Sequence, residues 1–313
     1  MINLSSSIGI SIFPRDGESS VELMRAADKA RNEAKKQRGS YLFYTGSLHK
    51  KATQRIRLIG QLRAALKNGE FKLLYQPIID SRGRLVAAEA LLRWHSPEEG
   101  SVPALEFIPV LEETGLIVPV GHWILKTACR EAALWHDAGF SFQVYVNLSV
   151  KQFHDQGLEE CVSNALSETG LPAEKLGLEI TESLLFENIE GTLSRLTYLQ
   201  NMGVSFALDD FGTGFSSLSY LKDLPVNTLK IDKYFIQGIP QSAEDAAIVS
   251  SVISMAKGLG LKLVAEGVEK QEQLEYLLSG GCDRIQGFIY SPPIESKDLL
   301  SYAENVPSLY SET

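Results

Sequence analysis

The chain has 313 residues, 44% of them hydrophobic, which is enough for one large domain and a smaller piece. Its formal net charge of −9 argues against a general nucleic-acid-binding surface, because no excess of positive charge attracts phosphate. The three cysteines are far apart in the sequence, as is typical of reduced thiols, and no apolar run is long enough to span a membrane. We therefore expect a cytoplasmic protein that binds no DNA or RNA duplex. This chain has no membrane segment of its own, although upstream segments of a full-length protein would be free to supply an anchor.

Residues 1–46 form a distinct N-terminal region. The alternating run "SSSIGISIFP" indicates a strand, a helix starting at Ser19 or Ser20 follows, and "GSYLFYT" indicates a second strand. A strand, helix and strand of this size cannot bury their own apolar faces, so we interpret the region as the end of a truncated domain. Residues 47–69 are predicted to form a basic amphipathic helix, a linker or first helix whose charged side faces solvent.

Strands and helices alternate through residues 70–303, and residues 304–313 form a tail. About eight strands in a repeated strand–helix pattern predict an α/β protein with a TIM-like (βα)₈ barrel. A doubly wound open sheet is the alternative, although no GxGxxG motif opens a helix. The strands are expected at residues 71–79, 85–92, 142–148, 176–181, 204–209, 226–231, 261–265 and 283–289. The helices are expected at residues 104–114, 120–138, 151–168, 185–201, 243–259 and 269–279.

Acidic and amide side chains recur where the predicted strands end. They are Glu89, Asn147, Glu179, Asp209, Asp210, Glu266 and Gln286. In a parallel barrel all these strand ends meet at one mouth. Oxygen donors without thiolate or imidazole suit Mg²⁺ or Mn²⁺, and two such ions would offset the mutual repulsion of five carboxylates. Paired ions of this kind clamp both oxygens of a phosphoryl displacement, which predicts a two-metal phosphoryl-transfer site.

Lys230, at another strand end, is the candidate group for orienting a water molecule or offsetting charge on the phosphate. A Schiff-base lysine is the alternative, and it would leave the carboxylates unexplained.

Simpler roles remain open for single residues. Glu89 would pair with Arg93, Asn147 would cap a helix near Ser149, and the acidic pair before "FGTG" would form a turn.

Nine ordered motifs between about Lys51 and Leu300 resemble the EAL family, the phosphodiesterases of the bacterial second messenger cyclic di-guanylate. They are "YQPI", "EALLRW", "EFIPVLEETGLI", "VNLS", "LEITES", "DDFGTGFSSLSYL", "LKID", "VAEGVE" and "QGF". The resemblance implies a TIM-like barrel with an antiparallel first strand. It also implies hydrolysis of cyclic di-guanylate to linear pGpG that needs Mg²⁺ or Mn²⁺ and is inhibited by Ca²⁺, in a homodimer formed through this domain.

The same resemblance assigns roles to individual residues. Metal would be held by Glu89, Asn147, Glu179, Asp209, Asp210 and Glu266. The catalytic set would be Lys230, Glu89, Asp209, Glu266 and Glu269. Substrate contacts would come from Gln76, Leu91, Arg93 and Gln286, and Glu182 would anchor the "DDFGTG" loop. All catalytic positions match the family motifs, which favours an enzyme over the alternative, a non-catalytic receptor for cyclic di-guanylate on the same fold.

The opening segment "SIGISIFPRDGESSVELMRAADKARNEAKKQ" resembles the C-terminal end of a GGDEF (diguanylate cyclase) domain. The GGDEF signature itself is absent from this chain, so we expect no cyclase activity from it.

Overall fold

The structure is a computed structural model that describes residues 6–35, 40–186, 189–212 and 221–305. The chain divides into two compact units, Met1–Asn68 and Gly69–Thr313.

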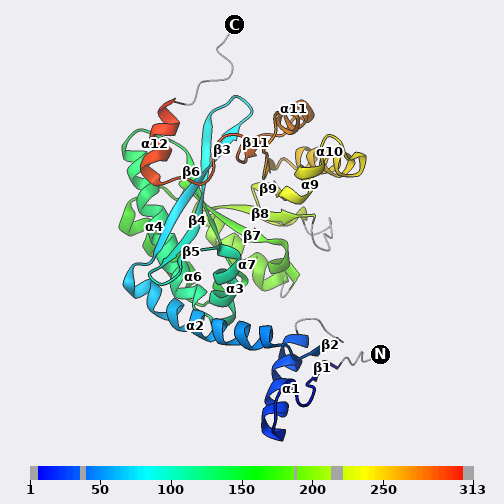
Figure 1. Cartoon of the computed structure of the whole chain (residues 1–313). Coiled ribbons are helices and arrows are strands. Elements are labelled where there is room, and N and C mark those ends of the chain that lie inside the picture. Colours follow the sequence, from blue (N-terminus) through cyan, green and yellow to red (C-terminus); the bar gives the residue numbers. More distant parts are fainter. Residues whose placement is uncertain (1–5, 36–39, 187–188, 213–220, 306–313) are drawn as a thin grey trace. The chain divides into compact units, whose positions relative to one another are not determined.

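The N-terminal unit contains the expected strand, helix and strand, followed by a long helix (Figure 1). Strands β1 (Ile8–Ile10) and β2 (Tyr41–Phe43) pair in parallel, with α1 (Ser20–Ala34) between them in the sequence. Helix α2 spans Gly46–Asn68. Large apolar side chains of this unit are exposed, as expected of a piece too small to bury them; examples are Phe13, Met24 and Tyr41. The origin of this unit in a GGDEF domain stays a prediction.

The second unit is a closed barrel of eight strands, which rules out the open-sheet alternative. The strands follow one another around the barrel in chain order, and pairing of the first two closes it. The first strand of the barrel is antiparallel to both of its neighbours, as the family resemblance implied. All other neighbouring strands of the barrel pair in parallel. The barrel strands are β3 (Phe71–Asp80), β4 (Leu85–Ser96), β6 (Gln143–Asn147), β7 (Leu176–Thr181), β8 (Ser205–Phe211), β9 (Thr228–Ile231), β10 (Lys262–Ala265) and β11 (Arg284–Gln286).

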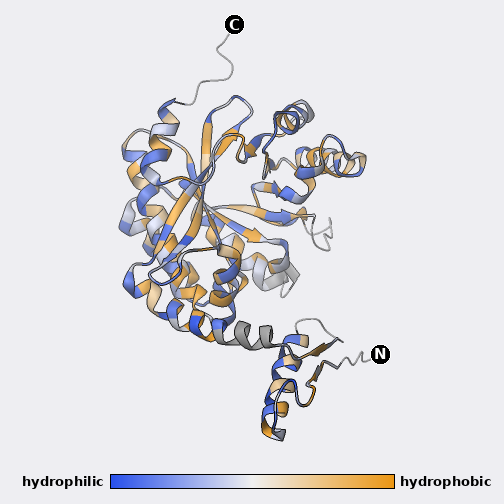
Figure 2. Cartoon of the chain, viewed as in Figure 1, coloured by the Kyte–Doolittle hydropathy of each residue, from blue (hydrophilic) through white to orange (hydrophobic). Residues whose placement is uncertain are grey.

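Helices surround this barrel in Figure 1, and Figure 2 shows apolar residues along the strands. The helices are α3 (Ala104–Thr114), α4 (Ile117–Asp137), α5 (Val150–Phe153), α6 (Leu158–Thr169), α7 (Ile189–Asn201), α9 (Lys233–Gly238), α10 (Ala243–Gly258), α11 (Gln271–Gly280) and α12 (Ser296–Asn305). Two 3₁₀ segments, Ala173–Lys175 and Glu182–Phe186, flank β7. Across the described residues, no helix combines the length and apolarity needed to cross a membrane.

Some of the expected elements were wrong in detail. The helix expected at 151–168 is two helices, because a turn in which the Gly157 N–H donates to Asp155 Oδ2 interrupts it. The helix expected to start at residue 185 is replaced at its beginning by the 3₁₀ segment Glu182–Phe186. Strand β5 (Gly100–Val102), which pairs antiparallel with the end of β4, and helices α9 and α12 were not expected.

The barrel interior has an apolar layer and a polar layer. The apolar layer is the buried cluster Ile78, Ala87, Tyr145, Ala207 and Val264. Residues i and i+2 of a strand face the same side of the sheet, so on β4, β6, β8 and β10 the residue two positions after the member of this apolar cluster also faces the barrel interior. These residues are Glu89, Asn147, Asp209 and Glu266. The strand period therefore stacks the polar residues directly on the core. Asn147 ends β6, Asp209 lies near the end of β8 and Glu266 directly follows β10, whereas Glu89 lies inside the longer strand β4.

Candidate active site

A single lysine lies at the centre of the polar layer. The side chain of Lys230, from β9, is fully buried. Its Nζ atom lies 2.5 Å from Oε1 of Glu266, 2.8 Å from Oε2 of Glu179, 3.3 Å from Oε2 of Glu89 and 3.7 Å from Oδ1 of Asp209. The structure thus brings together one cation and four carboxylates that are far apart in the sequence.

Amide side chains hold Glu89 from two directions. Asn147 Nδ2 donates to Oε1 of Glu89 at 2.6 Å, and Gln286 Nε2 donates to Oε2 of Glu89 at 2.6 Å. Gln286 also donates to Oε1 of Gln76 at 3.2 Å. Glu89, Gln76, Asn147 and Gln286 therefore form one connected network with Lys230.

The register of strand β8 is irregular at the adjacent residues Asp209 and Asp210. The pairing of β8 with β9 shifts between Leu208 and Phe211, and this shift includes Asp209 and Asp210. Asp210 has a φ of 56°, in the left-handed region that non-glycine residues seldom adopt. Its backbone N–H donates to Oδ1 of Asp209 at 2.9 Å. Bulges of this kind are common beside active sites, where they redirect a side chain.

Burial and crowding shift the proton affinities of the carboxylates. Burial, followed by the charge of Glu89, raises the pKa of Glu179 well above its usual value. Burial also raises the pKa of Asp209, although Lys230 opposes the shift. The pKa of Glu266 is raised to about 8, again by burial and against the effect of Lys230.

Two members of the cluster are held in their charged forms. Burial acts against the charge of Glu89, but Lys230 and the hydrogen bond from Gln286 outweigh it, so its pKa is lowered. Burial also acts against the charge of Lys230, yet the surrounding carboxylates, Asp209 first, raise its pKa well above the usual value. Lys230 is therefore a cation over the whole physiological range.

Asp210 stands slightly apart and is less buried. Burial, the charge of Asp209 and the nearby Asp232 raise the pKa of Asp210 to about 6. Asp232 was not singled out from the sequence. It caps α9, where its Oδ1 accepts from the N–H of Tyr234 at 2.7 Å. In the sequence, only its position two residues after Lys230 could have indicated that Asp232 lies near the site.

The donor set fits hard divalent cations in its chemistry, because it offers carboxylate and amide oxygens only. Oε1 of Glu179 is buried and has no hydrogen-bond partner in the part of the chain that the structure describes, a costly state that a bound cation would relieve. The carboxylates of Glu89, Glu179, Asp209 and Glu266 all lie near Nζ of Lys230. In this arrangement the described residues contain no group of three or more His, Cys, Asp or Glu side chains placed to hold a metal ion.

Three of the four expected substrate-contacting residues lie on β3 and β4, beside the carboxylate cluster, and the fourth, Gln286, lies at the end of β11. Gln76 pairs with Glu89, and Leu91 and Arg93 follow two and four residues later on the same strand. Leu91 and Arg93 are partly exposed. Burial lowers the pKa of Arg93 and the charge of Glu89 partly offsets this. Nη1 of Arg93 donates to the carbonyl of Leu92 at 2.9 Å.

Two predicted residues are less closely tied to the cluster. Glu269 lies three residues after Glu266 in the β10–α11 connection and is exposed. Glu182 is buried, and neither carboxylate oxygen has a hydrogen-bond partner among the described residues. Most of the loop that Glu182 was expected to anchor, residues 213–220, lies outside the described residues, so both roles stay predictions.

The simpler roles considered for single residues are wrong for Asn147 and Glu89. Ser149 caps its own helix by accepting from the N–H of Gln152, while Asn147 donates to Glu89. Glu89 makes its hydrogen bonds with Lys230, Asn147 and Gln286.

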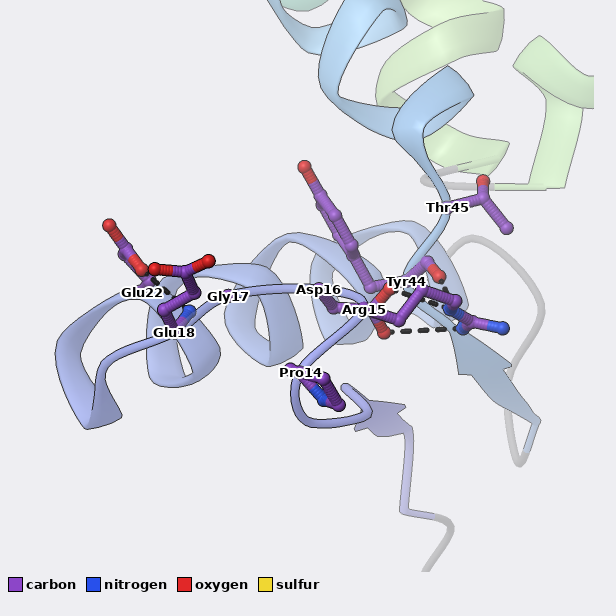
Figure 3. Close-up of a pocket in the computed structure, with 8 residues that line it drawn as sticks. All are labelled: Pro14, Arg15, Asp16, Gly17, Glu18, Glu22, Tyr44 and Thr45. Atoms are coloured by element: carbon purple, nitrogen blue, oxygen red, sulfur yellow. Dashed lines mark hydrogen bonds and ion pairs between the residues drawn. The ribbon is translucent and has the colours of Figure 1, made fainter.

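A separate hollow lies in the N-terminal unit (Figure 3). Its arginine, Arg15, donates to Oδ1 of Asp16 at 2.9 Å and to the carbonyl of Tyr44 at 3.4 Å. Glu22 accepts from the backbone of Glu18 and Ser19 at the start of α1. Arg15 and Asp16 thus pair with each other and Glu22 with the backbone, and we assign no ligand to this hollow.

The family of the chain follows from comparison with known proteins. The model of the EAL domain family matches residues 59–293, which include the whole polar layer. The chain belongs to the EAL domain family. The antiparallel first strand and the carboxylates at the barrel mouth are thus features of an EAL domain.

Curated relatives of this EAL domain include named enzymes. "Bifunctional diguanylate cyclase/cyclic di-GMP phosphodiesterase MucR" of Pseudomonas aeruginosa is 43% identical over 96% of this chain and 44% of its own length. "Cyclic di-GMP phosphodiesterase PdeR" of Escherichia coli is 37% identical over 93% of this chain and 44% of its own length. The chain thus spans less than half the length of either relative.

The fold also matches solved EAL structures. The structure described as "PaMucR Phosphodiesterase, c-di-GMP complex" aligns with a TM-score of 0.76 and 43% identity, covering 78% of this chain and 99% of that one.

Proposed function

We propose that this EAL domain hydrolyses one phosphodiester bond of cyclic di-guanylate, giving linear pGpG, with two Mg²⁺ or Mn²⁺ ions. The observation that carries the proposal is the meeting of Glu89, Glu179, Asp209 and Glu266 around Lys230 at one end of the barrel. Four acidic groups share one buried lysine, so the cluster can be fully ionised only when further positive charge is present. Binding of an anionic phosphodiester in such a site requires additional positive charge.

Divalent ions would supply this charge, activate a water molecule and stabilise charge on the phosphate. Glu89, Asn147, Glu179 and Asp209 would hold one ion, with Asp209, Asp210 and Glu266 around the second. Asn147 and Gln286 keep Glu89 in place through their hydrogen bonds, so part of the set is oriented in advance.

Lys230 acts in this proposal as a fixed cation at Nζ. Its raised pKa keeps the amine protonated, which suits a group that orients the attacking water and faces developing negative charge. The same raised pKa disfavours the Schiff-base alternative, because an amine nucleophile must lose its proton first.

Substrate would lie over β3 and β4. The partly exposed guanidinium of Arg93 would bind a phosphate, since Arg offers several N–H donors to phosphate oxygens. Leu91, two residues before Arg93 on the same strand face, would contact a base, and Gln76 would add a polar contact.

Turnover tests the proposal. Purified protein incubated with cyclic di-guanylate and Mg²⁺ or Mn²⁺ should release pGpG, which is detected by chromatography. Ca²⁺ should inhibit this release. Tight binding of cyclic di-guanylate without pGpG release would support the receptor alternative instead. Trapping of substrate on Lys230 by borohydride, with activity that survives EDTA, would support the Schiff-base alternative. The expected homodimer is a separate proposal, which light scattering would test.

A further inference from the structure

The connection between β10 and α11 carries two of the predicted active-site acids. Glu266 directly follows β10, and Glu269 comes three residues later, just before the helix begins at Gln271. The backbone N–H of Glu266 donates to the carbonyl of Ile231 at 3.1 Å, next to Lys230. The conformation of residues 266–270 therefore determines where both carboxylates lie.

A buried glutamine of α11 accepts hydrogen bonds from the backbone of this connection. Gln273 is only 3% exposed. Its Oε1 accepts from the N–H groups of both Glu269 and Lys270, each at 3.0 Å. Its Nε2 donates to the carbonyl of Ile236 in α9 at 2.9 Å. One side chain thus joins the connection that bears Glu266 and Glu269 to the helix that follows Lys230.

The connection is also packed tightly on its other sides. The N–H of Val268 donates to the carbonyl of Gln286 at 3.2 Å. Gly267 has a φ of 65°, and a Cβ added there would lie 2.5 Å from Cβ of Lys233. Gly287 leaves no room for a Cβ either, because the carbonyl oxygen of Val268 would lie 2.0 Å away. Among the described residues, only Gln273 joins this connection to α9 through side-chain hydrogen bonds, so loss of its side chain frees one side of the connection.

We propose that Gln273 is a positioning residue of the EAL site, which fixes Glu266 and Glu269 relative to Lys230 by accepting the N–H groups of Glu269 and Lys270. This inference rests on the proposed function, because it assigns Gln273 to the metal-binding side of the same site. Gln273 touches neither substrate nor metal in this proposal and acts through the backbone of the connection.

The test compares two glutamines of the same helix. Gln273→Met keeps the approximate volume of the side chain but removes its donor and acceptor. Gln271→Met is the matched control, since Gln271 is exposed and, within the described part of the chain, its side chain donates only to Oε1 of Glu275 on its own helix. Gln273→Glu is the conservative variant, because its carboxyl group keeps an acceptor for both backbone N–H groups and, in the protonated form that burial favours, also a donor for the carbonyl of Ile236.

Three quantities are measured: amide hydrogen exchange at Glu269 and Lys270, the Kd for Mn²⁺ by calorimetry, and kcat and KM for cyclic di-guanylate. For Gln273→Met we expect exchange at these two amides to be at least about 10-fold faster and Mn²⁺ binding to be about 10–100-fold weaker. We expect kcat to fall in the same range while KM changes by less than about 3-fold, because the substrate contacts lie on other strands. Gln273→Glu should stay within about 3-fold of the wild type in exchange and in Mn²⁺ binding.

Exchange and Mn²⁺ affinity in Gln273→Met that match those of Gln271→Met would overturn the inference. So would a Gln273→Glu variant with slow exchange and an Mn²⁺ affinity as weak as that of Gln273→Met. If Gln273→Met does not fold, Gln273→Asn replaces it in the same comparison, because the shorter amide stays polar but is too short to keep all three hydrogen bonds of Gln273. The proposed function would fail in a different way, through absence of turnover in the wild type, and the exchange measurement would still test Gln273.

Discussion

The Nζ atom of Lys230 lies 2.8 Å from Oε2 of Glu179, and both side chains are fully buried. A buried ion pair repays its desolvation only when its geometry is good and its other polar atoms are satisfied. Oε1 of Glu179 lacks a hydrogen-bond partner among the described residues, and three further carboxylates surround the same lysine. Four acidic groups thus share one lysine, and our proposal that this cluster takes up divalent cations accounts for the acidic groups left without a cationic partner of their own.

Replacement of the central cation should expose this imbalance. Lys230→Met leaves the carboxylates buried without their counter-ion, so in EDTA we expect the free energy of unfolding to fall by about 3–5 kcal/mol. Mn²⁺ should restore part of this loss, because it replaces the missing positive charge, while turnover stays abolished. Urea unfolding with and without Mn²⁺ measures the effect. Lys297→Met, which removes an exposed pair with Glu295, is the control, and equal stability of the two variants in EDTA would refute the prediction.

Removal of Glu89 should abolish activity while the fold is retained. Glu89→Ala removes a predicted metal ligand, and an ion contributes several kcal/mol to the transition state, so turnover should fall on the order of 10³-fold or more. The circular dichroism spectrum should be unchanged. Glu106→Ala, on the exposed side of α3, should behave like the wild type. Turnover of Glu89→Ala at the rate of Glu106→Ala would show that the site has been assigned incorrectly.

The stability of the metal-free protein should fall as pH rises. The pKa of Glu266 is raised to about 8 in the folded protein, so the fold binds this proton more tightly than the unfolded chain does. Its contribution is complete below the ordinary glutamate pKa and is lost as pH rises through about 8. One pKa unit corresponds to about 1.4 kcal/mol, which makes the loss on the order of a few kcal/mol.

Thermal unfolding in EDTA between pH 5 and pH 8.5 measures this loss. Glu266→Gln cannot titrate, so its Tm should depend less on pH over this range. A pH dependence that is the same in both proteins would contradict the role of Glu266.

Gly177 should be essential for packing of the barrel interior. A Cβ added there would lie 2.4 Å from two ring carbons of Tyr145, and Tyr145 is itself buried in the core cluster. We expect Gly177→Ala to lower the free energy of unfolding by about 1–3 kcal/mol. Gly258→Ala, where no heavy atom lies within 4 Å of the added Cβ, should be neutral or stabilising. The two variants are compared by urea unfolding, and equal stabilities would show that the interior yields to the added methyl group.

Much of the fold could be predicted from the sequence because the strands are continuous apolar runs separated by amphipathic helices. All eight barrel strands lie where the pattern placed them. The pattern could not give the direction of β3, since a strand has the same period of two in either direction. Short elements were missed for a similar reason: α9 has six residues and β5 has three, too few for a period to be recognised.

The sequence predicted which residues form the site but not how their side chains are arranged. Acidic residues at strand ends indicated that Glu89, Glu179, Asp209 and Glu266 would meet, and the structure brings them together. Their arrangement around Lys230 could not be predicted, because it depends on which strand face each side chain shares and on the register shift in β8. Gln273 gave no signal in the sequence, since its role arises from three contacts with backbone atoms of other segments.

Turnover of cyclic di-guanylate by the purified chain, measured as pGpG released in Mg²⁺, in Mn²⁺, in Ca²⁺ and in EDTA, is the decisive measurement. We expect release of pGpG with Mg²⁺ or Mn²⁺, inhibition by Ca²⁺, and none after EDTA until Mg²⁺ or Mn²⁺ is returned. Equal release of pGpG after complete removal of metal would contradict a metal-dependent site formed by these carboxylates.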